Sequence, residues 1–108
     1  MILQDFEQER QIATESRDYL RTLVSDVAEN RESIDRELEQ ALTNWRLERL
    51  SVIDRNILRL AAAEMLYTKD VPAAVSIQEA ITLAEKYGTT ESPRFVNGVL
   101  DALRKAIS

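Results

Sequence analysis

The side chains that most often carry out covalent catalysis are largely absent from this sequence. It contains neither cysteine nor histidine, so it lacks thiolate nucleophiles, the commonest general base and the commonest metal ligand. The candidate nucleophiles that remain, Ser51, Ser76 and Ser92, each stand where a helix is expected to begin, and helix capping explains them there. Gly88 and Gly98 are isolated and form no phosphate-binding loop. We therefore expect a protein that is not an enzyme and that uses no cofactor or metal.

One group of residues is suited to binding. Phe95 lies in the first turn of the last expected helix, off its apolar stripe, with Arg94 beside it and Gly98 one turn further on. Helix N-termini favour anions, and an aromatic ring beside a cation is a surface on which an unpaired base stacks. The alternative is that Phe95 packs against another helix, which the missing side chain at Gly98 would allow to approach. The residue types alone favour that alternative, because most aromatic side chains are buried.

A single acidic residue, Glu64, interrupts the most apolar segment of the chain. Between residues 57 and 67 only Arg59 and Glu64 are charged, which is typical of a helix at the centre of a bundle. A buried carboxylate needs hydrogen-bond or ion-pair partners. We expect backbone N–H groups, Arg59 or an arginine from another helix to supply them. A functional acid with a raised pKa is the alternative, but no catalytic group is seen near it.

Length and composition favour one small all-α domain. The chain has 108 residues, only four of them glycine or proline, and 31% are charged. No apolar run approaches the roughly 20 residues that span a bilayer, and no signal peptide is recognised, so we expect a cytoplasmic protein with no membrane contact. The net charge is −5, with −4 carried by residues 1–30, whereas residues 67–108 are neutral. If RNA is bound, the C-terminal part repels it less.

Apolar residues recur with helical spacing in five stretches of the sequence. These stretches lie at residues 20–27, 34–45, 57–67, 77–84 and 96–107. Asn30 is expected to separate the first two, and Ser51 to cap the third. Ser76 and Glu79 match a capping box, and Gly88 suits the left-handed position after a helix. Ser92 followed by Pro93 is expected to begin the last helix.

Three segments in the second half of the chain resemble a known family in order and spacing. They lie at residues 53–61 (IDRNILRLA), residues 71–88 (with VSIQEA and LAEKYG) and residues 95–100 (FVNGVL). Together they are similar to the NusB family of transcription antitermination factors without gaps over residues 45–103. Residues 18–45 fit that family more loosely.

The resemblance implies a fold, an activity and partners. The fold is an all-α, NusB-like helical bundle of about five helices, and residues 1–108 form a single domain with a divergent or partly ordered segment at residues 1–17. The implied activity is transcription antitermination in ribosomal RNA operons. The implied partners are single-stranded boxA-type RNA, the ribosomal protein NusE and the antitermination complex of RNA polymerase.

The resemblance also assigns roles to individual residues. The RNA surface of the family uses the loop before the last helix and its first turn. By resemblance the RNA-binding residues are Glu91, Ser92, Arg94 and Phe95, with Phe95 stacking on a base. Acidic positions that face NusE in the family match Glu48 and Asp54.

The N-terminal segment departs from the family. Members open with an arginine-rich helix that supplies much of the RNA contact, whereas residues 1–17 here are acidic. Two alternatives to an antitermination factor stay open: a protein-interaction module that has lost RNA binding, or the RNA-binding accessory domain of a ribosomal RNA methyltransferase. Without its usual first helix, the apolar face of residues 20–45 also favours self-association or a partner helix.

Overall fold

The computed structural model describes residues 18–19, 21–43, 46–68 and 70–107. Residues 21–29 are helical and are followed by α2 (Arg31–Ala41), the 3₁₀ turn η1 (Leu47–Arg49), α3 (Val52–Tyr67), α4 (Ala73–Tyr87) and α5 (Ser92–Ile107). All regular structure in these ranges is helical. The predicted all-α bundle of about five helices is therefore confirmed.

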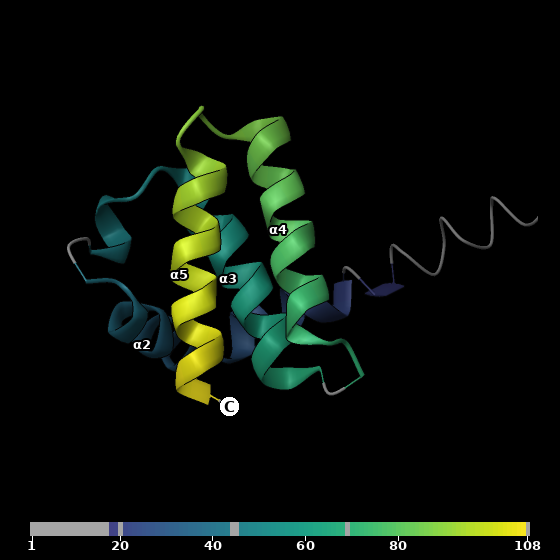
Figure 1. The fold of residues 1–108 in the computed structure, drawn as a ribbon. Helices are drawn as coiled ribbons and strands as arrows, with labels where there is room; N and C mark the ends of the chain where they lie inside the picture. Colours follow the sequence, from purple (N-terminus) through teal and green to yellow (C-terminus); the bar gives the residue numbers. More distant parts are fainter. Residues whose placement is uncertain (1–17, 20, 44–45, 69, 108) are drawn as a thin grey trace, which may run out of the picture.

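The helix α3 lies at the centre of the bundle and contacts α2, α4 and α5. In Figure 1, α4 and α5 run side by side and α3 crosses behind them. Its three consecutive alanines are at most 7% exposed, which lets neighbouring backbones approach closely. The residues of the core with no exposed surface come from every labelled α-helix: Ile34, Leu38, Leu58, Ala62, Ala63, Ala84, Val96, Leu100 and Leu103.

Two of the predicted helix boundaries are confirmed. The hydroxyl of Ser51 accepts a hydrogen bond from the backbone N–H of Asp54 at 3.1 Å, as expected of the residue that caps α3. Asn30 separates two helices, because residues 21–29 end there and α2 begins at the next residue. Its side chain donates back to the carbonyl oxygen of Asp26 at 3.0 Å.

Two other local predictions are wrong. Ser76 does not begin a helix, because α4 already starts at Ala73 after Pro72, and the Ser76 hydroxyl donates to Glu64 instead. Gly88 ends α4 with a φ of −93°, so it is not left-handed. A Cβ atom at Gly88 would lie 2.5 Å from both Cβ and Oγ of Ser92, so the glycine is required for close packing of the loop against α5.

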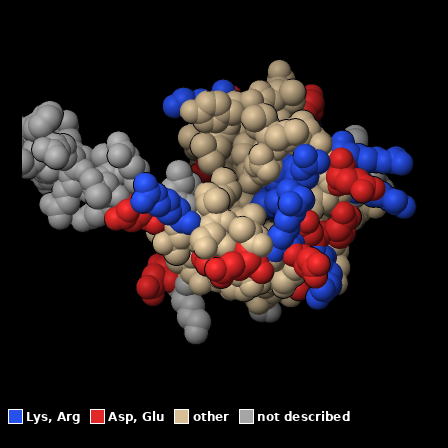
Figure 2. Space-filling model, turned by 180° about the vertical axis from the view of Figure 1, so that it is seen from behind, with Lys and Arg blue, Asp and Glu red and all other residues tan. Residues whose placement is uncertain are grey.

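The surface carries both signs of charge in alternation. Figure 2 shows lysines and arginines beside aspartates and glutamates over the lower part and the right-hand side of the face behind α5, and a mainly uncharged area at its upper centre. Several apolar side chains are also exposed, among them Tyr19 (42%) and Val24 (52%) near the N-terminal end. The apolar face expected to be incompletely covered over residues 20–45 is mostly buried within the described residues, because Leu23, Ile34 and Leu38 lie in the core and Val24 is its exposed member. None of the helices in the described ranges has both the length and the apolar character needed to cross a membrane.

Candidate nucleic-acid interface

The loop between α4 and α5 holds the predicted RNA-binding residues in place. Ser92 is 1% exposed, and its hydroxyl accepts a hydrogen bond from the backbone N–H of Thr89 at 2.9 Å. The backbone N–H of Phe95 donates to the carbonyl oxygen of Glu91 at 3.1 Å, which fixes the first turn of α5. Glu91 and Arg94 are exposed, and Phe95 is half-buried against the core. The contribution of Ser92 is therefore to position the loop beneath these three residues.

A hollow of about 430 Å³ brings all four predicted RNA-binding residues together. Its other wall comes from η1 and the start of α3, and includes Arg49 and Asp54. We call it the Asp54 hollow. The resemblance assigned Asp54 to a protein partner and Glu91, Ser92, Arg94 and Phe95 to RNA, yet in the structure Asp54 lines the same hollow as those four residues. Two acids and two arginines line it, so its formal charges balance.

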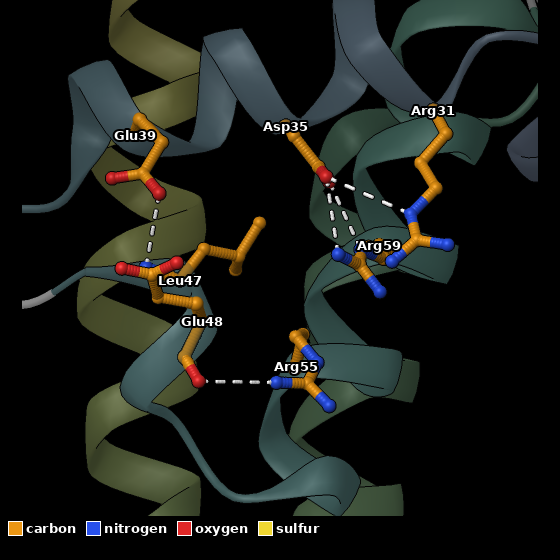
Figure 3. Close-up of polar contacts among 7 residues, drawn as sticks. All are labelled: Arg31, Asp35, Glu39, Leu47, Glu48, Arg55 and Arg59. Atoms are coloured by element: carbon orange, nitrogen blue, oxygen red, sulfur yellow. Dashed lines mark hydrogen bonds and ion pairs between the residues drawn. The ribbon is translucent and has the colours of Figure 1, made fainter.

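Glu48 lies outside this hollow on the exposed surface of η1. Its carboxylate is 3.9 Å from Arg46, and both side chains are more than 70% exposed, so the pair contributes little to stability. Its backbone carbonyl accepts a hydrogen bond from Arg55 at 3.3 Å (Figure 3). The two residues predicted to contact NusE therefore lie at neighbouring positions, one on η1 and one at the start of α3.

Polar contacts tie η1 and α3 to α2 and so fix one wall of the hollow. The carboxylate of Asp35 accepts two hydrogen bonds from the guanidinium of Arg59, at 2.9 and 3.0 Å, and the Arg59 side chain is only 12% exposed. The carboxylate of Glu39 accepts a hydrogen bond from the backbone N–H of the buried Leu47 at 3.0 Å (Figure 3). Arg59 is therefore paired with Asp35 rather than with Glu64.

Two buried polar atoms beside the hollow have no hydrogen-bond partner among the described residues. They are Oδ1 of Asp54 and Nε of Arg55. Unpaired buried polar atoms are rare in folded proteins and call for an explanation. The unpaired Oδ1 of Asp54 is itself buried, and the half-buried side chain to which it belongs lines the hollow.

A second hollow of about 360 Å³ lies on the other side of Phe95. It is formed by the last residue of α2 and the two residues after it (41–43), and by Arg94, Phe95, Gly98, Val99 and Ala102 of α5. We call it the Gly98 hollow. Phe95 and Arg94 line both hollows. Phe95 thus satisfies part of each sequence interpretation, because its ring packs on the core and also borders open space. The idea that Gly98 admits a neighbouring helix is wrong for the described residues, since a Cβ there would meet nothing within 4 Å.

A third hollow, of about 280 Å³, surrounds Glu64 and was not predicted. Glu64 is 5% exposed and accepts hydrogen bonds from the hydroxyl groups of Tyr19 and Ser76. Burial, and then the hydrogen bond to Glu64, raises the pKa of Tyr19 to about 12. Burial, and then the charge of Glu64, raises the pKa of Glu79. The polar partners of Glu64 are therefore hydroxyl groups from two other helical segments, which the sequence pattern did not reveal. We call this the Glu64 groove.

The three serines considered as nucleophiles all have structural hydrogen bonds. Ser51 caps α3, Ser76 donates to Glu64, and Ser92 accepts from the loop. Within the described ranges, no group of three acidic side chains is arranged to hold a metal ion.

The fold and its hollows define a class of protein. A helical bundle with an aromatic ring and a cation between two open hollows is suited to binding a partner on its surface. The sequence model of one family, described as the NusB family, matches residues 2–105. The chain therefore belongs to the NusB family.

Relatives of known name agree with this assignment. Transcription antitermination protein NusB of Pseudothermotoga lettingae is 51% identical over 85 residues, which cover 79% of this chain and 61% of that protein. The protein of the same name from Clostridium novyi is 42% identical over 107 residues, which cover 97% of this chain and 80% of that one. The chain thus spans between about three-fifths and four-fifths of the length of these two relatives.

Two solved structures share the fold. NusB from T. maritima superposes with a TM-score of 0.80 at 45% sequence identity, covering 84% of this chain and 64% of that one. A chain in a structure described as "Crystal Structure of a Plectonemic RNA Supercoil" superposes with the same TM-score at 33% identity, covering 86% of this chain and 67% of the other.

Proposed function

We propose that this chain is a transcription antitermination factor of the NusB type, which binds boxA-like single-stranded RNA of ribosomal RNA operons together with the ribosomal protein NusE. The observation that carries the proposal is the position of Phe95 and Arg94 between two open hollows in a member of this family. The names of the relatives support the antitermination role. The role is one of binding, without a chemical step.

The RNA contact in this proposal is centred on the first turn of α5. The half-buried ring of Phe95 is held by the core and offers a surface to a base, so little side-chain freedom is lost on stacking. The exposed guanidinium of Arg94 lies beside it and neutralises a phosphate. Ser92 anchors the loop, and the carboxylate of Glu91 opposes the phosphate charge and so weakens binding.

The protein contact in this proposal is at the start of α3. Glu48 is exposed there, and the half-buried Asp54 lines the adjoining hollow, so both carboxylates attract a basic group of NusE. Because Asp54 and Phe95 line the same hollow, NusE and RNA would meet across it. Each ligand would then strengthen the binding of the other by an equal factor.

Fluorescence anisotropy with labelled boxA-like RNA, with and without NusE, tests the proposal. We expect Phe95→Ala to lower RNA affinity about tenfold, because a stacked base contributes about 1–3 kcal/mol. Arg94→Ala should lower affinity and also reduce its salt dependence. Tyr87→Ala is the matched control, because Tyr87 is also an aromatic residue beside a cation but lies outside both hollows. Its side chain is 60% exposed, and the centroid of its ring lies 5.7 Å from Nζ of Lys86. Equal affinity for the wild type and both variants at Phe95 and Arg94 would refute this surface.

The net charge of −5 supports a second candidate, a protein-interaction module that has lost RNA binding. The two acidic residues of the Asp54 hollow also favour this candidate, since they would repel phosphate and attract a basic protein. Measurable NusE binding without any salt-sensitive RNA binding would favour the module over the antitermination factor.

A further inference from the structure

Gly98 has no packing role within the described structure. It lies inside α5, where glycine is less favourable than alanine because it loses more backbone freedom on folding. A Cβ atom at this position would meet nothing within 4 Å. Gly88 is the opposite case, since a Cβ there would collide with Ser92. None of the described residues therefore fills the space above Gly98.

The Gly98 hollow has the size and lining of a binding site for a planar ring. The hollow has a volume of about 360 Å³ and is open to solvent, so a ring lying in it would be covered on one face. Gly98 is one helical turn after Arg94 and one turn before Ala102, so a strip of bare helix surface forms its floor. The hydroxyl of exposed Thr43 at its rim is able to donate or accept a hydrogen bond.

The charges around Phe95 distinguish the two hollows. Arg94 is the one charged residue among the described residues that line the Gly98 hollow. The Asp54 hollow on the other side has two acids, Asp54 and Glu91, beside its arginines. A nucleic-acid backbone is favoured where a cation is present without opposing carboxylates. Since Phe95 and Arg94 border both hollows, a strand that contacts them reaches the Gly98 side without a break.

We propose that the Gly98 hollow is a second nucleotide subsite for single-stranded RNA, which takes the base next to the one stacked on Phe95. The inference rests on the proposed RNA binding and extends it along α5. A base lies on the bare surface of Gly98 and Ala102, and its phosphate pairs with Arg94. A side chain at position 98 would occupy the position of this base.

Filling the hollow with side chains tests this subsite on the full chain. Gly98→Leu places an isobutyl group in the middle of the hollow. Ala102→Leu, tested separately, places the same group at the end of the hollow away from Arg94. Ala102 is seven residues from Phe95, so Ala102→Leu leaves the stacking ring untouched. Ala106→Leu is the control, because Ala106 is exposed on the same helix and lines neither hollow. Leucine is a good helix former, so all three variants should remain folded, as circular dichroism will verify.

We expect both variants in the hollow to lower affinity for a boxA-like RNA about tenfold, with Ala106→Leu unchanged. Wild-type affinity in both hollow variants, combined with a loss of affinity in Phe95→Ala, would overturn the subsite and leave the proposed function standing. No RNA binding by the wild type would overturn both. A loss of NusE binding with RNA affinity retained would assign the hollow to the protein partner and also overturn the subsite.

Discussion

The Glu64 groove and the surface around Phe95 are both partly apolar hollows, but they place their charges in opposite ways. In the groove a carboxylate is buried beneath hydroxyl groups, and no lysine or arginine lines it among the described residues. At Phe95 the carboxylates stand on one side only, and an exposed arginine borders both hollows. The difference teaches that the net charge of −5 does not decide where RNA is tolerated, because screening limits the charges that matter to those within about 10 Å.

The comparison assigns each region a separate task. Hydrogen bonds to Glu64 join Tyr19 and α4 to α3, so the groove contributes to holding these segments together. The Phe95 surface contacts the core on one side and open space on the other, which suits recognition. Changes in the groove should therefore alter stability, and changes around Phe95 should alter binding.

The largest effect is expected from Glu64→Ala. Removing the carboxylate leaves the Ser76 hydroxyl, which is 2% exposed, without the partner it bonds at 2.5 Å, and opens space among α3 and α4. We expect the free energy of unfolding, measured in urea, to fall by about 2–3 kcal/mol. RNA affinity per folded molecule should not change.

Glu64→Gln serves as the control for this substitution. It keeps the shape of the side chain and one carbonyl acceptor for the hydroxyl groups, so it should cost less than Glu64→Ala. A variant at Glu64 that stays fully stable but loses RNA affinity would break the comparison, because the groove would then be part of the binding surface.

A smaller effect is expected from Tyr19→Phe, which removes one hydrogen bond to Glu64. The loss should be about 1 kcal/mol at neutral pH, since Tyr19 is 42% exposed and water partly replaces the contact. The pKa of Tyr19 in the folded protein, about 12, lies above its ordinary value of 10.0. The folded state therefore holds this proton more tightly, and the resulting stability is complete below about pH 10 and is lost as the pH rises towards about 12.

Urea unfolding across that pH window separates Tyr19 from the other groups that titrate there. The difference in stability between the wild type and Tyr19→Phe should shrink as the pH rises. A difference that stays constant across the window would mean that the phenol and Glu64 are not coupled in solution.

Much of the fold was predictable because helical periodicity and composition are local signals. The apolar segment from residue 57 to 67 was expected at the centre of the bundle, and α3 occupies that position. The cap at Ser51 was also found, since a capping serine acts on a backbone group three residues away. Ser76 shows the limit of such signals. Its sequence context fits a capping box, but a tertiary hydrogen bond to Glu64, twelve residues earlier, takes the hydroxyl instead.

The candidate site was predictable in part. Phe95 and Arg94 were singled out from residue type and position in the last helix. The sequence did not reveal that Asp54 joins them in one hollow, because that proximity depends on how α3 crosses α5. Nor did it reveal the space beside Gly98, since the sequence alone does not distinguish a glycine that close packing requires from a glycine that leaves space open. Gly88 and Gly98 turn out to be one of each.

The smallest expected effect offers the sharpest comparison of the two regions. Glu91→Gln removes one negative charge beside Arg94 and Phe95, and should raise RNA affinity about twofold at low salt with little change in stability. Glu79→Gln removes the same charge from the Glu64 groove and should leave RNA affinity unchanged. Both variants have the same net charge. Anisotropy titrations of the two variants therefore separate the effect of where the charge lies from the effect of the total charge. An equal gain in both would mean that RNA responds only to the overall charge, and the distinction between the two regions would fail.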